Sequence, residues 1–235
     1  MAKEIDDRLT FVSEADIGVA IQHGWCRYNN AAPANNDSIF LLMAQWALET
    51  NRGKAMHNFN VGNVKDVAGV GAYDWQYFPC EEDLDPGYAA KLSTSPLVKI
   101  VGHNAAGLCT TWFYPKHPGC CFRAFETLDD GVLDHLVLLN HNPHFKCAWP
   151  AVLQGNPQQF VHLLKASGYF TASEAQYTKS VTSLFLEYKH KIVLPPPPTF
   201  TDVEQAQISS AVALSMQNQI DNADYAFRST TDEVS

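Results

Sequence analysis

The strongest pattern in the chain is an apolar run from Ile39 to Leu48, which is interrupted only by Gln45. A helix that is apolar on all sides is a buried helix rather than a surface one. Asn36 or Asp37 is expected to cap its start, because short polar side chains accept hydrogen bonds from the first free amides of a helix. The pattern therefore predicts a central buried helix.

Glu49 directly follows this apolar run, and Gly53 stands where a left-handed residue would end the helix. Two effects are expected to raise the pKa of Glu49 at that place. Apolar surroundings disfavour the anion, and so does the negative end of the helix dipole. The simpler alternative is a solvated acid at a helix end, and the neighbouring residues decide between the two.

Four further segments have helical periodicity or capping signals. A short helix is expected after the capping box Ser13-Glu-Ala-Asp16, and a second one from Leu128, capped by Thr127, through about Asn140. The other two are expected over 157–165, with Pro157 in the first turn and Gly168 after the end, and over 174–189, capped by Ser173.

Residues 64–121 are rich in glycine, proline and aromatic residues, and they lack helical periodicity. Leu97–Val101 and Leu108–Tyr114 have the composition of strands. We expect a small β-containing lobe here, facing the Glu49 helix across a cleft. Its aromatic rings include Trp112, a candidate for stacking on a sugar ring.

The C-terminal part begins with the stiff polyproline stretch Pro195–Pro198. A linker over 195–200, a helix over 201–228 and a disordered tail over 229–235 are expected after a main domain over 1–194. The helix has three possible roles: packing on the domain, contacting a partner, or joining a larger assembly.

Composition narrows the functional classes. Of the 235 residues 46% are hydrophobic and 17% charged, which suits one good-sized folded domain. A net charge of −9 argues against a nucleic-acid partner. No apolar run reaches the roughly 18 residues of a membrane span. The acidic N-terminus lacks the apolar segment of a signal peptide, so synthesis without one is expected.

The six cysteines include no CxxC pair, so a zinc ribbon is not expected. Their even number permits disulfides in an oxidising space, and buried free thiols are the alternative. His141, His144 and Cys147 lie close in sequence, but their loop position and the lack of a fourth ligand argue against a metal site. No metal or cofactor is expected.

Asn60-Val-Gly-Asn63 places two amides around a glycine, shortly after Glu49. Amides donate and accept hydrogen bonds, which suits sugar hydroxyls and N-acetyl groups. A plain turn is the alternative.

Three segments resemble the bacterial glucosaminidase family, which includes autolysin N-acetylglucosaminidases, the flagellar peptidoglycan hydrolase and phage lysins. The first is Ala47–Lys65, with its Leu-Glu-Thr and Asn-Val-Gly-Asn runs; the others are Cys121–Leu139, beginning Cys-Phe-Arg-Ala-Phe, and Leu163–Tyr177, with Ser-Gly-Tyr-Phe-Thr. The resemblance spans roughly residues 38–190. It implies an α+β, mainly α, lysozyme-like fold, with a helical lobe and a small irregular β-containing lobe around a cleft.

The resemblance also implies roles for single residues. Glu49 would be the general acid, and Tyr177 would face the active site and bind an N-acetyl carbonyl or orient a water. The remaining implied or candidate substrate contacts are Asn60, Asn63, Met56, Phe59, Trp112 and Phe122.

One departure concerns the second acid. Family members often carry it near the end of a Thr-Thr-Tyr-Glu-like strand, whereas Thr110-Thr-Trp-Phe-Tyr114 has none. Glu81, Glu82 or Asp74 is the expected replacement, in a mobile loop that closes over substrate.

The implied activity is hydrolysis of the β-1,4 glycan backbone of peptidoglycan, between N-acetylglucosamine and N-acetylmuramic acid. A lytic transglycosylase, a non-catalytic glycan-binding module of the same fold and a partner-binding protein built on the C-terminal helix are the alternatives. Action in the periplasm or cell wall would follow phage lysis or secretion-system delivery. An antibacterial effector would have a delivery or immunity partner.

Overall fold

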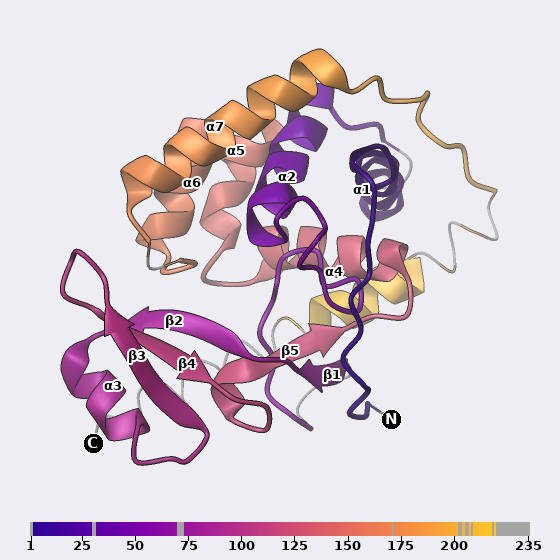
Figure 1. Ribbon diagram of the computed structural model, residues 1–235. Coiled ribbons are helices and arrows are strands. Elements are labelled where there is room, and N and C mark those ends of the chain that lie inside the picture. Colours follow the sequence, from indigo (N-terminus) through magenta and orange to yellow (C-terminus); the bar gives the residue numbers. More distant parts are fainter. Residues whose placement is uncertain are drawn as a thin grey trace. The chain divides into compact units, whose positions relative to one another are not determined.

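The computed structural model describes residues 2–29, 32–69, 73–170, 172–201, 204, 207, 209–217 and 219. The chain divides into two compact units (Figure 1). One unit comprises residues 1–7 and 65–124, and the other comprises 8–64 with everything from 125 onward.

The larger unit is helical, and α2, the predicted central helix, lies in its core. α2 packs against both α1 and α7, while α1 also packs against α4 (Figure 1). The elements of this unit, in chain order, are α1 (Glu14–Tyr28), α2 (Asn36–Glu49), α4 (Leu128–His141), the 3₁₀ turn η2 (Lys146–Ala148), α5 (Trp149–Leu153), α6 (Pro157–Ala166) and α7 (Glu174–Lys191).

The prediction of a buried helix is confirmed, since every residue of α2 from Ser38 to Ala47 is buried. The expected cap was wrong by one residue. Asn35, rather than Asn36 or Asp37, precedes the first turn and accepts a hydrogen bond from the Asp37 amide through its side chain. Asx residues in a row all suit the cap position, so local sequence gives the place only approximately.

The other predicted helices are confirmed as well, although Ser173, at the N-cap position of α7, makes no side-chain capping hydrogen bond. Ser13 caps α1 through the Asp16 amide, but α1 runs on to Tyr28 instead of being short. Thr127 caps α4 through the Asp130 amide. α6 and α7 begin at Pro157 and Glu174 as expected and extend one or two residues further. None of the described helices combines the length and apolarity required to cross a bilayer.

The smaller unit is built on two antiparallel sheets. β1 (Asp74–Tyr77) pairs with β5 (Cys121–Ala124), and β2 (Cys80–Leu84), β4 (Cys109–Phe113) and β3 (Val98–His103) form a sheet in the order β2-β4-β3. α3 (Pro86–Leu92) and the 3₁₀ turn η1 (Pro118–Cys120) complete the unit. Its core contains the stacked rings of Phe78 and Phe122, whose centroids lie 4.0 Å apart. The strands predicted within Leu97–Val101 and Leu108–Tyr114 are confirmed as β3 and β4.

The acidic stretch was expected to be a loop, and this expectation was wrong. Glu81 and Glu82 lie in β2, where they pair with Trp112 and Thr111 of β4, and Asp74 begins β1. Ladder hydrogen bonds and the apolar residues Cys80 and Leu84, which pack on the small core, outweigh the weak strand propensity of acids.

The described part of the C-terminal segment packs on α4. Val212 is buried with Leu133 and Val137, and the buried Gln219 side chain donates a 2.9 Å hydrogen bond to Asp134 Oδ1. The capping box at Thr201 forms with Glu204. The predicted tail over 229–235 and the last part of the predicted helix lie outside the described residues. All six cysteines are free thiols.

Candidate active site

Glu49 and Tyr177 meet at the junction of two helices. Glu49 is the last residue of α2, and Tyr177 lies at the start of α7. The Tyr177 hydroxyl donates a 2.6 Å hydrogen bond to Glu49 Oε1. Tyr177 is buried, whereas Glu49 is half-buried. The phenol therefore fixes the orientation of a carboxyl group that remains partly accessible.

The phenols of Tyr177 and Tyr169 both interact electrostatically with the Glu49 carboxyl group. Burial raises the pKa of Tyr177 well above its usual value, and the charge of Glu49 raises it further. The pKa of Tyr169 is likewise raised well above its usual value by burial and then by Glu49, although contact with Gln45 opposes the shift. Both phenols consequently stay protonated at neutral pH and act as hydrogen-bond donors.

The ring of Tyr177 is held by aromatic stacking. Phe170 stacks on it almost face to face, with centroids 3.9 Å apart and planes 5° apart. Lys165 supports this segment, because its ammonium group donates to the carbonyls of Phe170 and Ala172 at 3.3 and 2.9 Å and lies 5.3 Å from the Phe170 ring centroid. The phenol that orients Glu49 is thus itself fixed.

The Asn60–Asn63 segment is a tight turn against the end of α2. Asn60 closes it, accepting from the Val64 amide at 2.8 Å and donating to the Val64 carbonyl at 2.9 Å. Asn63 Nδ2 donates to the backbone carbonyl of Glu49 at 2.5 Å. Phe59 and Asn63 have φ angles of 53° and 46°. This region is costly for phenylalanine, is adopted more readily by asparagine, and is often found at functional sites.

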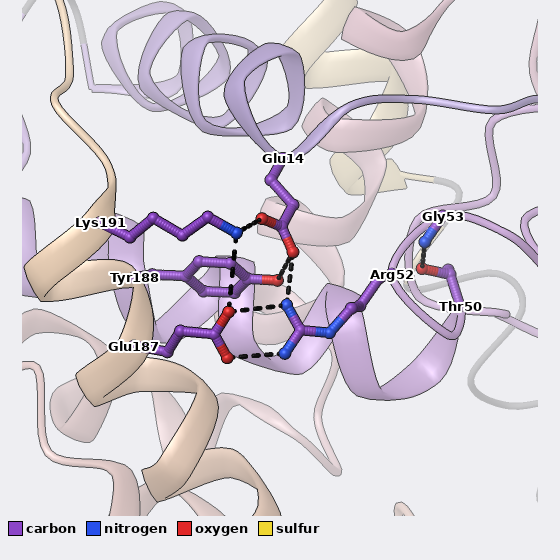
Figure 2. A network of polar contacts seen from close by, with 7 residues as sticks. All are labelled: Glu14, Thr50, Arg52, Gly53, Glu187, Tyr188 and Lys191. Carbon is purple, nitrogen blue, oxygen red and sulfur yellow. Dashed lines mark hydrogen bonds and ion pairs between the residues drawn. The ribbon is translucent and has the colours of Figure 1, made fainter.

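The turn that ends α2 is tied to α1 and α7 by charged side chains. Figure 2 shows Arg52 reaching Glu14 of α1 and Glu187 of α7. Arg52 binds Glu187 with both Nη atoms, at 3.0 and 2.6 Å, and Glu14 at 2.5 Å. Lys191 and Tyr188 also contact Glu14, at 2.7 and 3.2 Å. The two helix segments that carry Glu49 and Tyr177 are therefore cross-linked.

Gly53 occupies this turn for a steric reason. Its φ of 78° is the expected left-handed conformation. A Cβ at this position would come within 2.8 Å of the Val12 carbonyl oxygen and 2.9 Å of the Trp46 ring. Thr50 completes the turn, because its hydroxyl accepts from the Gly53 amide at 2.9 Å and donates to the Trp46 carbonyl at 2.6 Å.

The other predicted substrate contacts are not all at the surface. Met56 is fully buried in the helical core, and Phe59 is half-buried beside it. In the small unit Phe122 is buried in the core, whereas Trp112 is half-buried on β4. A glycan would reach Met56 or Phe122 only if those cores opened, so their side chains are placed for packing.

The candidate second acids all lie in the small unit. Glu82 is on the face of β2 that carries Cys80 and Leu84, and it forms a 2.7 Å ion pair with Lys65. Glu81 points to the opposite face and is exposed. Asp74 Oδ1 accepts from the Lys3 amide at 2.9 Å. Which of them takes part in a reaction remains a prediction.

Sequence reasoning did not single out Tyr169 as a site residue. It lies one residue after Gly168, which has the left-handed φ of 79° expected at the end of α6. That glycine turns the chain so that Tyr169 comes back toward α2, with its hydroxyl 3.4 Å from the Gly62 carbonyl. A tyrosine directly after a helix-ending glycine was the available signal. Within the described residues, no group of three or more His, Cys, Asp or Glu side chains could hold a metal ion.

A partly accessible carboxyl group at the end of a buried helix, oriented by a buried phenol in a mainly helical α+β fold, defines the class of this protein. It is a glycoside hydrolase of lysozyme-like fold. Residues 28–190 match the Glucosaminidase family, described as mannosyl-glycoprotein endo-beta-N-acetylglucosaminidase, and the chain belongs to that family. Neither the curated proteins nor the solved structures give a match.

Proposed function

We propose that this protein hydrolyses the β-1,4 glycan backbone of peptidoglycan between N-acetylglucosamine and N-acetylmuramic acid, with Glu49 as the general acid. The observation that most supports this proposal is the 2.6 Å hydrogen bond between Tyr177 and Glu49 at the end of the buried helix α2. The net charge of −9 does not hinder binding of an uncharged sugar backbone.

In the proposed reaction the Glu49 proton passes to the glycosidic oxygen while the bond from that oxygen to the anomeric carbon breaks. Because Glu49 Oε1 accepts from Tyr177, the proton to be donated resides on Oε2. Asn63 is bonded to the Glu49 backbone, so it holds the helix end in place. Asn63 is half-buried, and its amide is the one proposed to contact the substrate's hydroxyl and N-acetyl groups. Asn60 is buried and bonds Val64 with both side-chain polar atoms, so its part in this proposal is to hold the turn.

The second step requires a group that delivers water or stabilises the positive anomeric carbon. Glu82, Glu81 and Asp74 are the carboxylates proposed for it, and the substrate's own N-acetyl group is another source. In a lytic transglycosylase, a sugar hydroxyl attacks instead of water, and Glu49 alone would suffice. A protein with this proposed activity would act in the periplasm or cell wall, where peptidoglycan lies. Phage lysis or delivery by a secretion system would bring it there. A protein delivered as an antibacterial effector would have an immunity partner.

Replacing the proton donor tests the proposal. Glu49→Gln keeps the shape and removes the proton, so release of reducing ends from purified peptidoglycan should fall by about a hundredfold or more. Binding to insoluble peptidoglycan should persist. Glu126→Gln makes the same change at an exposed position and should leave the rate unchanged. A Glu49→Gln rate equal to that of the parent would refute the assignment, and binding without any cleavage by the parent would favour the glycan-binding alternative.

Product masses distinguish the finer possibilities. Digests with reducing N-acetylglucosamine ends indicate a glucosaminidase, reducing N-acetylmuramic acid ends indicate a muramidase, and an anhydro-sugar indicates a transglycosylase. A mannosylated glycoprotein should be tried in parallel, because the family description names that substrate. Preferential cleavage of the glycoprotein would contradict the peptidoglycan proposal.

A further inference from the structure

A buried polar pair links α2 to α4 behind the site. Gln45 is the only polar residue in the apolar run of α2, and it lies one helical turn before Glu49, so both side chains project from the same face. Gln45 is completely buried, and its Oε1 lies 3.1 Å from Nε2 of the buried His135 on α4. A buried amide costs folding free energy unless it is hydrogen-bonded, and His135 provides that bond for Gln45. Apolar side chains would fill the same space without this cost, so the polar pair calls for a role besides packing.

His135 in turn supports the Asn60–Asn63 turn. A Cβ on Gly62 would lie only 2.4 Å from His135 Nδ1 and 2.7 Å from Cε1. The backbone of the turn therefore rests directly on the imidazole ring, which is possible only because residue 62 has no side chain. The Tyr169 hydroxyl makes a long, 3.4 Å contact with the Gly62 carbonyl.

The Asn60–Asn63 turn connects this buried pair to the end of α2. Gln45 also opposes the effect of burial on the pKa of the Tyr169 phenol, although that pKa is raised overall. The turn itself bonds to the Glu49 carbonyl through Asn63. A continuous set of contacts thus runs from His135 through Gly62 and Asn63 to the end of α2.

We propose that His135 and Gln45 are positioning residues that hold the Asn60–Asn63 turn against the catalytic end of α2. Gln45 orients the imidazole, and the imidazole forms the surface on which Gly62 lies. Neither residue touches substrate in this proposal; they act through Asn60 and Asn63. The inference rests on the proposed function for its catalytic consequence, but the structural part is measurable without any activity.

Hydrogen exchange of the turn tests the structural part. The Asn63 amide bonds the Asn60 carbonyl, and the Val64 amide bonds Asn60 Oδ1. His135→Leu removes the bond to Gln45, so these two amides should exchange about tenfold faster, equivalent to roughly 1.4 kcal/mol. His135→Gln retains a donor near the Nε2 position and should exchange within about threefold of the parent. The Phe160 amide in α6 is the internal reference.

Unchanged exchange at Asn63 and Val64 in His135→Leu would overturn the proposal. So would an equal acceleration at Phe160, because it would show general destabilisation. These outcomes do not depend on whether the protein cleaves peptidoglycan. In an active parent, His135→Leu should raise KM several-fold with little change in kcat, and His135→Gln should restore KM.

A double-mutant cycle tests the contact between Gly62 and His135. Gly62→Ala should speed exchange of the turn amides in the parent, because its methyl group overlaps the imidazole ring. In a His135→Ala background, the added effect of Gly62→Ala should shrink, since the overlapping ring is gone. Additive effects of the two substitutions would contradict the contact.

Discussion

At the scale of residues, the site depends on pairs rather than on single side chains. Glu49 alone is an acid at a helix end, and Tyr177 alone is a tyrosine at a helix start. Their 2.6 Å hydrogen bond, with Phe170 stacked on the phenol, gives the carboxyl group one orientation. Preorganisation of this kind reduces the reorganisation needed before proton transfer.

We expect Tyr177→Phe to lower kcat on peptidoglycan by about ten- to hundredfold, the range expected for loss of one hydrogen bond to the carboxylate that forms as Glu49 gives up its proton. The ring, and hence its stack on Phe170, is kept. Tyr28→Phe is the matched control, because the Tyr28 phenol bonds Asn140 and His141 instead of Glu49. Steady-state kinetics measure kcat for both variants, and thermal unfolding measures their stability. Equal losses of activity in both variants would show that Tyr177 acts only through stability.

At the scale of elements, α2 and α7 are held together by contacts at two places. α2 ends with Glu49, α7 begins near Tyr177, and Arg52 connects the end of α2 to Glu187 further along α7. Burial alone would raise the pKa of Glu14, but hydrogen bonds from Lys191, Arg52 and Tyr188 outweigh it and lower the pKa. The hydrogen bond from Arg52 also lowers the pKa of Glu187.

The lowered pKa values of Glu14 and Glu187 determine how the stability of the fold changes with pH. A carboxyl group whose pKa is lower in the folded state stabilises the fold above its unfolded pKa, and that contribution disappears as the pH falls through the folded pKa. For Glu14 and Glu187 the loss therefore begins as the pH drops below their ordinary value of 4.5. Near neutral pH both carboxylates contribute their full stabilisation to the fold.

Arg52→Gln should reduce the free energy of unfolding by about 1 kcal/mol near neutral pH, a modest value because the charges are partly exposed. The difference between parent and variant should narrow at about pH 4 and below. Urea unfolding at several pH values measures it, with Lys54→Gln, in the same turn region but exposed, as the control. A difference that stays constant down to strongly acidic pH would contradict the ionic contribution.

At the scale of the whole chain, the family match ends at residue 190, but folded structure continues beyond that residue. Leu194 packs against the helical core, and the carbonyl of Pro195 accepts a 2.9 Å hydrogen bond from Gln22. Beyond it, Val212 and Gln219 bury part of α4. Of the three roles considered for this segment, its described residues favour packing on the helical unit.

A chain ended after Thr199 should be less stable by about 2 kcal/mol, the approximate value of burying one aliphatic side chain such as Val212. The melting temperature should fall by roughly 4–8 °C. Peptidoglycan digestion well below that temperature should match the full chain, because none of the proposed site residues lies in the removed part. Loss of digestion by a folded, truncated protein would assign the segment a direct role.

Several features followed from local sequence because their causes are local. The apolar run of α2, the caps at Ser13 and Thr127, and the left-handed glycines Gly53 and Gly168 act within a few residues of themselves. The limits of local reasoning appeared in β2, whose acids suggested a loop. Pairing with β4 decided that segment, and a ladder partner almost thirty residues away leaves no mark on local propensity.

The sequence by itself determined that a buried helix ends in an acid followed by a turn rich in amides, and its motifs indicated the family. Only the tertiary structure decided which side chains meet that acid. Tyr177 reaches Glu49 across 128 positions, and His135 meets Gln45 across 90. Such pairs depend on how helices pack, and packing is set by the whole core rather than by any one segment.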